Sequence, residues 1–127
     1  MNVKKKGSIM TNPLVGVWEL VSDTHEGLFI VAETHAVHLL TEKNRELFSN
    51  ENEPTEAEEL AAFRSMLAGA GTYSVSGNVF AFTNSVSRTP NHGDDKKTFS
   101  FEFTIEGDTV TYKDTSDGHT FVFRKIG

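Results

Sequence analysis

Hydrophobic and polar residues alternate along much of this chain, which is the period of a β-strand with one buried face. In the stretch KTFSFEFTI, for example, Phe99, Phe101 and Phe103 are separated by Ser100 and Glu102. Alternating or apolar runs of this kind predict eight strands, over about residues 14–22, 28–32, 35–41, 72–75, 79–87, 96–105, 109–114 and 120–126. Gly-Asn, Gly-Asp and Asp-Gly pairs between the later runs are hairpin turns, so the last five strands form a meander.

One segment between the third and fourth strands has a helical period instead. Thr55 and Glu58 have the spacing of a capping box, in which each side chain accepts a hydrogen bond from the backbone of the other residue. Apolar residues then recur at i, i+3 and i+7, which places them on one helix face: Leu60, Phe63 and Leu67. Gly69 and Gly71 are typical stop signals. The pattern predicts a single long helix over about residues 56–68.

Eight sequential antiparallel strands leave two exposed edges, and closure into an up-and-down barrel removes both. We therefore predict a mainly β fold, an eight-stranded antiparallel barrel with one helix inserted between strands 3 and 4. The phenylalanines of the later strands share one face of each strand and should point inward: Phe80, Phe82, Phe99, Phe101, Phe103, Phe121 and Phe123. A barrel of this size is either filled by side chains or holds one small ligand, and periodicity leaves both open.

Composition narrows the class of protein. The 127 residues suit one domain, for which we predict a flexible tail over 1–11 and a barrel domain over 12–127, with Met10 as an alternative start. The net charge of −6 disfavours nucleic acid and anionic membranes as partners. The chain has no cysteine, which excludes disulfides and thiolate chemistry. No run reaches the ~20 apolar residues of a membrane span, so the cytoplasm is the expected location.

The histidines are the first candidates for chemistry. His35 and His38 lie three apart on a predicted strand, so they face opposite sides and do not form a joint metal site. One of them should point inward, where an imidazole is the best proton-handling candidate of the chain. The remaining histidines lie in or beside turns, where solvation is expected: His25, His92 and His119. A metal site of His92 with two nearby aspartates matches no established spacing, so no metal and no cofactor are predicted.

Carboxylates and tyrosines are the other candidates. Glu19 and Glu102 lie within apolar runs, and either would be a desolvated acid if it faced inward, although polar neighbours favour an outward Glu102. Tyr73 and Tyr112 offer hydroxyl groups that would orient a ligand in an apolar pocket, or would pack at its rim. No nucleophile elbow, Walker loop or dinucleotide-binding glycine motif is present in the sequence.

The stretch NPLVGVWELVS, with Gly16-Val17-Trp18, resembles the G-x-W opening of the bacterial lipocalin-like domain family within the wider calycin group. EGLFIVAETHAVHLL, AGAGTYSVSGN and FVFRK follow in the order typical of that family, so the resemblance covers the chain from Asn12 onward. It implies an eight-stranded barrel with Trp18 packed at the closed end and a basic residue of the last strand across it, for which Arg124 is the match. It also implies a pocket for a hydrophobic ligand, without naming the ligand.

These observations favour non-covalent binding of a small hydrophobic molecule inside the barrel, with the phenylalanine rows as walls and His38, Tyr73 or Tyr112 as polar contacts. The alternative is a cofactor-independent isomerase, cyclase or hydratase acting on a hydrophobic metabolite in the same pocket, and the sequence does not decide whether the protein is an enzyme. A third hypothesis is a packed barrel that acts through its surface or as a homodimer.

Overall fold

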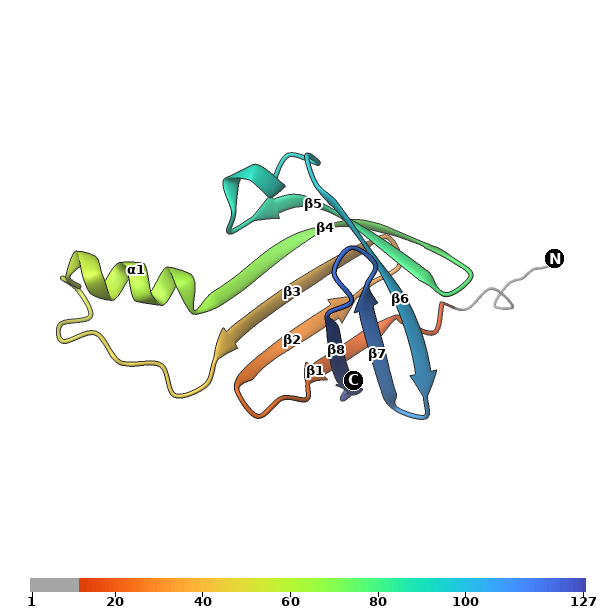
Figure 1. Ribbon diagram of the computed structural model, residues 1–127, viewed down its shortest axis with the longest axis horizontal. Coiled ribbons are helices and arrows are strands. Elements are labelled where there is room, and N and C mark those ends of the chain that lie inside the picture. Colours follow the sequence, from red (N-terminus) through yellow and green to blue (C-terminus); the bar gives the residue numbers. More distant parts are fainter. Residues whose placement is uncertain (1–11) are drawn as a thin grey trace.

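The computed structural model describes residues 12–127 as a closed antiparallel barrel, in which each strand pairs with the next and the last pairs with the first (Figure 1). The strands are β1 (Gly16–Leu20), β2 (His25–Val31), β3 (His35–Glu42), β4 (Met66–Ser76), β5 (Val79–Ser87), β6 (Thr98–Glu106), β7 (Thr109–Asp114) and β8 (Thr120–Lys125). Helix α1 (Glu56–Arg64) lies between β3 and β4, and the 3-10 turn η2 (Pro90–His92) lies between β5 and β6. The predicted fold class is confirmed. The predicted tail, residues 1–11, lies outside the described residues.

Buried hydrophobic side chains fill one end of the barrel interior. Leu14, just before β1, is fully buried, and its carbonyl accepts a hydrogen bond of 2.9 Å from Trp18 Nε1. Antiparallel pairing brings the end of β2 and the start of β7 to the same end of the barrel, so Val31 and Val110 pack there too. The buried core comprises Leu14, Trp18, Phe29, Val31, Ala36, Phe80, Phe82, Val110, Tyr112 and Phe123. We refer to the Leu14 side as the closed end.

The helix is shorter than predicted. Its capping box forms as expected, since Thr55 Oγ1 accepts from the Glu58 backbone and Glu58 accepts from the Thr55 backbone. It ends at Arg64 because β4 begins at Met66, so both glycines predicted as stop signals lie inside that strand. A Cβ at Gly71 would overlap the carbonyl oxygen of Thr83 on β5, which explains the absence of a side chain there.

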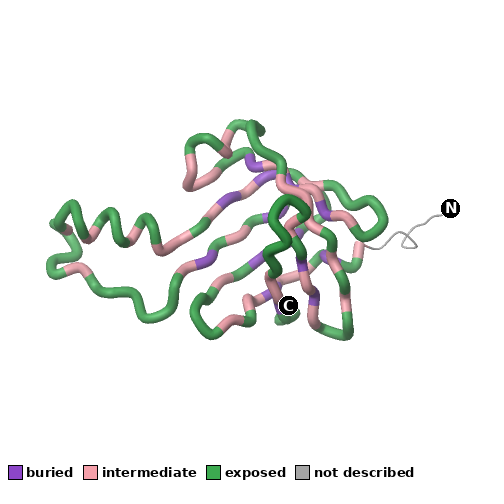
Figure 2. Tube along the Cα trace, in the orientation of Figure 1, coloured by how far each residue is buried: buried purple, intermediate pink, exposed green. Residues whose placement is uncertain are grey.

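The predicted apolar face of the helix does not pack against the barrel. Leu60 and Phe63 are about half exposed, at 49% and 46%, while Leu67 belongs to β4. Residues 43–65, which we call the arm, project away from the barrel and are mostly exposed (Figure 2). Arg88 at the end of β5 holds the base of the arm, because its Nη1 donates to the carbonyls of Phe63 and Met66 and its guanidinium lies 4.5 Å from the Phe63 ring centre.

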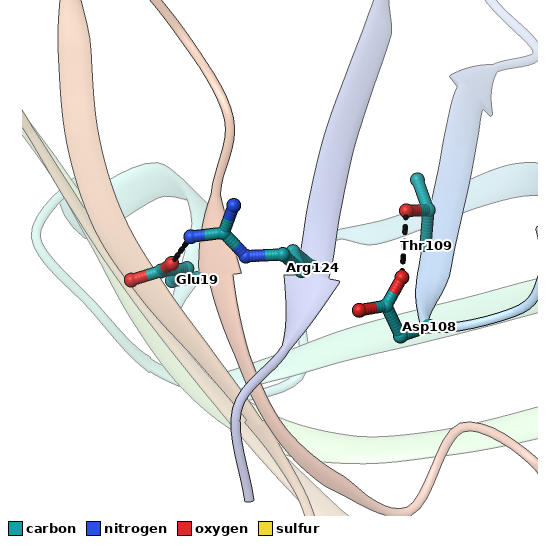
Figure 3. A network of polar contacts seen from close by, with 4 residues as sticks. All are labelled: Glu19, Asp108, Thr109 and Arg124. Atoms are coloured by element: carbon teal, nitrogen blue, oxygen red, sulfur yellow. Dashed lines mark hydrogen bonds and ion pairs between the residues drawn. The ribbon is translucent and has the colours of Figure 1, made fainter.

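The cation over Trp18 is Lys125 and not Arg124. Trp18 pairs with Lys125 in the β1–β8 register, and Lys125 Nζ lies 5.9 Å from the indole ring centre. Arg124 is one position earlier and therefore faces outward, where it forms an ion pair with Glu19 of β1 (Figure 3). The predicted Arg124–Trp18 contact is wrong by one residue, which in a strand means the opposite face.

The outer surface of β2 and β3 is also apolar. Leu28 lies opposite Leu39, and Ile30 lies opposite Val37, and all four side chains are between 42% and 48% exposed. Both faces of this hairpin are therefore rich in hydrophobic residues, whereas the outer face of β6 carries Ser100, Glu102 and Thr104. Within residues 12–127, no helix has the length and hydrophobicity needed to cross a bilayer.

Candidate functional site

A cavity of about 160 Å³ lies inside the barrel, toward the end opposite Leu14. Its walls are mainly phenyl rings, which come from β2, β5, β6 and β8: Phe29, Phe80, Phe82, Phe99, Phe101, Phe121 and Phe123. The predicted phenylalanines line it with the exception of Phe103, which packs against Tyr112 at a ring-centre distance of 6.3 Å. The barrel is thus filled at the closed end and hollow toward the other, which answers the question that the sequence left open.

The cavity leads to the mouth of the barrel. A wider hollow of about 520 Å³ lies at the ends of β1, β3 and β5 and at the starts of β2, β4 and β8. It shares three lining residues with the cavity, which form the neck between the two: Leu40, Leu67 and Phe121. Charged and polar side chains such as Glu42, Arg64 and Arg88 surround this outer hollow. A ligand would therefore pass through an outer hollow that is lined by both polar and apolar side chains into an apolar chamber.

His38 is the histidine that points inward. It lies on the same face of β3 as Ala36 and Leu40, lines the cavity, and contacts the Phe82 ring edge-on at 5.4 Å. His35 is exposed on the opposite face, where its Nδ1 is 2.6 Å from Thr34 Oγ1. Burial lowers the pKa of His38 from 6.5 to about 4, because the apolar surroundings disfavour the imidazolium. His38 is therefore uncharged at neutral pH.

Asn84 is the polar residue of the cavity that sequence reasoning missed. Its side chain is only 2% exposed, and its Oδ1 has no hydrogen-bond partner among the described residues. Asn84 pairs with Gly71 in the β4–β5 register, but its Oδ1 reaches the space beside Gly69, which is the register partner of His38. A Cβ at Gly69 would overlap Asn84 Oδ1 and lie 2.9 Å from His38 Cε1, so this glycine makes room for both polar side chains.

A signal for Asn84 was present in the sequence. Phe80, Phe82 and Asn84 are spaced by two, so an inward-facing phenylalanine row necessarily continues to this amide. A polar residue in register with two buried rings is unusual, because burial of an amide without a partner costs about 1–3 kcal/mol. Buried polar atoms are normally paired with protein groups or ordered water, so an unpaired amide oxygen in a cavity marks a position where a bound molecule could donate a hydrogen bond.

The two predicted tyrosines have separate roles. Tyr112 on β7 lines the cavity, is 3% exposed, and has a hydroxyl without a partner among the described residues. Burial is the main cause that raises its pKa, so the phenol is neutral. Tyr73 lies toward the closed end, where its hydroxyl donates to the Ala32 carbonyl and accepts from Asn12 Nδ2 at 2.8 Å. Tyr73 therefore holds Asn12, in the segment before β1, by a hydrogen bond, and it does not line the cavity.

The remaining candidates lie outside the cavity or at its rim. Glu19 and Glu102 both face outward, as Glu102 was expected to do. His92, carried by η2, covers the edge of the Phe99 ring at 5.3 Å and lines the cavity, whereas His25 and His119 lie in the outer hollow. In the described part of the chain, no three histidine or acidic side chains are grouped closely enough to hold a metal ion.

No known protein family, curated protein or solved structure matches this chain. The resemblance to the lipocalin-like family therefore stays a prediction, as do the cytoplasmic location and the homodimer. What the site offers chemically is an apolar chamber with a small set of uncharged polar groups: His38, Asn84 and Tyr112.

Proposed function

We propose that this protein is a lipocalin-like binder of a small hydrophobic molecule, which it holds inside the barrel. The cavity of about 160 Å³, walled by phenyl rings, is the observation that carries the proposal. Apolar protein cavities of about 150 Å³ are known to stay dry and to take up benzene. The chamber is smaller than the ~300–1,000 Å³ of pockets for drug-sized ligands, so the ligand, or the part of it that enters the chamber, has about the size of one substituted ring.

Toluene is a suitable probe because it matches the chamber in size and has no polar group. We expect saturable chemical-shift changes in a 15N-NMR titration, confined to residues that line the cavity. Leu40→Phe should weaken binding, because Leu40 lies in the neck and a larger side chain would occupy the space of the ligand.

Leu39→Phe is the matched control. Leu39 is the next residue of β3, it is 48% exposed on the outer face, and its substitution should leave toluene binding unchanged. Non-saturating shifts spread over the outer surface, or equal effects of the two substitutions, would count against an interior site. Native mass spectrometry of the freshly purified protein would reveal a ligand carried from the cell.

A second candidate function rests on a different observation, the presence of His38 and Asn84 together in the apolar chamber. An uncharged imidazole accepts a proton, and the NH2 group of the Asn84 amide, not its Oδ1, would donate to a developing negative charge on oxygen, so the pair would support a cofactor-independent isomerase, cyclase or hydratase. Such an enzyme would exchange a carbon-bound proton of a bound carbonyl compound with solvent. Incubation in D2O followed by mass spectrometry would detect this exchange, which His38→Leu should abolish.

A further inference from the structure

The hydrogen-bonding groups of the chamber indicate which class of molecule it takes, given that the proposed interior binding is right. Ionisable residues of the lining are few, and among the described residues none is lysine or arginine. Asp114 at the rim carries the only carboxylate of this lining. An anionic ligand, such as a small aromatic carboxylate, would therefore lose its hydration inside the chamber without gaining a countercharge there, since Arg64 and Arg88 line the outer hollow and not the chamber.

The polar side chains of the chamber are suited to hydrogen-bond with a neutral polar group of the ligand. Asn84 Oδ1 is an acceptor without a donor, in a residue that is 2% exposed. The imidazole of His38 shares the space above Gly69 with it and offers one donor and one acceptor nitrogen in its uncharged form. A hydroxyl group both donates and accepts through one oxygen, and it is the smallest group that can satisfy Asn84 Oδ1 and one ring nitrogen of His38 together.

We propose that the ligand is an uncharged, ring-sized hydrophobic alcohol or phenol, whose hydroxyl group is recognised by Asn84 and His38 between β3, β4 and β5. The ring would contact the phenylalanine walls, and the hydroxyl would replace the missing partner of Asn84. A purely hydrocarbon ligand leaves that amide oxygen unpaired. Because an unpaired buried oxygen costs free energy, such a ligand should bind more weakly than one that carries a hydroxyl group.

Phenol and toluene test this proposal as a pair, since they differ only by a hydroxyl in place of a methyl group. Isothermal titration or NMR gives the ratio of their dissociation constants for the wild type and for each variant. Comparing these ratios between proteins cancels the different solubilities of the two probes in water. For Asn84→Leu, which keeps a similar volume, we expect the preference for phenol over toluene to fall about tenfold, the equivalent of one neutral hydrogen bond.

The control is Thr83→Val, the preceding residue of the same strand. Its hydroxyl lies 2.7 Å from Thr98 Oγ1 on the outer face, so its loss should not alter the ratio. His38→Leu gives a second, independent measurement and should also lower the preference for phenol. Benzoate at neutral pH should not bind the wild type.

The outcomes separate the two proposals. If toluene binds inside the barrel but the phenol-to-toluene ratio is the same in the wild type, Asn84→Leu and His38→Leu, the assignment of a hydroxyl-bearing ligand is wrong and the hydrophobic binder stands. If neither probe binds the cavity at millimolar concentration, the proposed function itself fails. Tight binding of benzoate would overturn the assignment to uncharged ligands.

Discussion

The inward-facing His38 should make the stability of the barrel depend on pH in a way that one substitution removes. The pKa of His38 is about 4 in the folded protein because of burial, and about 6.5 in the unfolded chain. Between these values the unfolded chain binds a proton that the folded protein excludes. Acidification therefore favours unfolding, and the effect is absent above pH 6.5 and complete below pH 4.

The magnitude follows from the size of the shift. Each pKa unit corresponds to about 1.4 kcal/mol, so the free energy of unfolding should fall by about 3 kcal/mol as the pH drops from 6.5 to 4. This is a large fraction of the 5–15 kcal/mol that is typical of small domains. Urea denaturation at several pH values measures the free energy of unfolding for the wild type and for His38→Leu.

The difference between the two proteins isolates the contribution of His38. His92 and Asp114, which line the same cavity, remain in both proteins and cancel to first order. His35→Leu is the matched control for the substitution itself, because this exposed histidine lies on the same strand and outside the cavity. A difference curve for His38→Leu that is flat between pH 4 and 6.5, or that has the opposite slope, would refute the assignment of His38 as a neutral residue that faces the cavity.

Three other substitutions test the packing around the cavity and around Trp18. Tyr112→Phe removes a buried hydroxyl without a partner among the described residues, so the free energy of unfolding should stay the same or rise by up to about 1–3 kcal/mol, and a lower urea midpoint would contradict this. Gly69→Ala places a methyl group against the side chains of Asn84 and His38, so we expect the free energy of unfolding to fall by about 1–3 kcal/mol and toluene binding to weaken. Unchanged binding in the NMR titration would argue against the described geometry. Lys125→Ala should shift the fluorescence of Trp18, the single tryptophan, and Arg124→Ala should not, so a shift with Arg124→Ala alone would restore the original expectation.

The strands and their inward faces could be predicted because each depends on local alternation. In a regular strand, a residue two positions from a buried phenylalanine faces the same side of the sheet, because successive side chains alternate between the two faces. This rule placed the rings of Phe80, Phe82 and Phe123 correctly in the interior. The closure of the barrel was predicted by a separate argument, since closure is the simplest way for eight sequential strands to leave no exposed edge.

The features that failed depend on contacts between distant segments. The helix was predicted too long because residues 66–68 continue its apolar period, yet they pair with β3, where Leu67 lies opposite Leu40. Gly69 resembles a helix stop in sequence, but its small size is explained by a side chain fifteen positions later, Asn84. The Arg124 error is of another kind, because Lys125 follows the inward-facing Phe123 by two positions. The alternation of the last strand already places Lys125, and not Arg124, on the face of Trp18.

The hollow in the barrel was beyond sequence reasoning for a simpler reason. Periodicity gives the direction of a side chain but not the volume that it leaves free. Whether the rings fill the interior depends on the barrel radius and on the tilt of each ring, and both are set by the whole sheet.

The arm beside the mouth leaves and rejoins the barrel at nearly one point. Glu42 N donates a hydrogen bond of 2.8 Å to the carbonyl of Ser65, and β3 and β4 remain paired as far as Thr41 and Met66. A short hairpin turn could therefore replace the segment without disturbing any ladder, and shortening a loop from about twenty residues to about four would recover about 1–1.5 kcal/mol of closure entropy. The barrel thus has a natural grafting point next to its opening, at which an engineered reporter module could be inserted to signal whether the chamber is occupied.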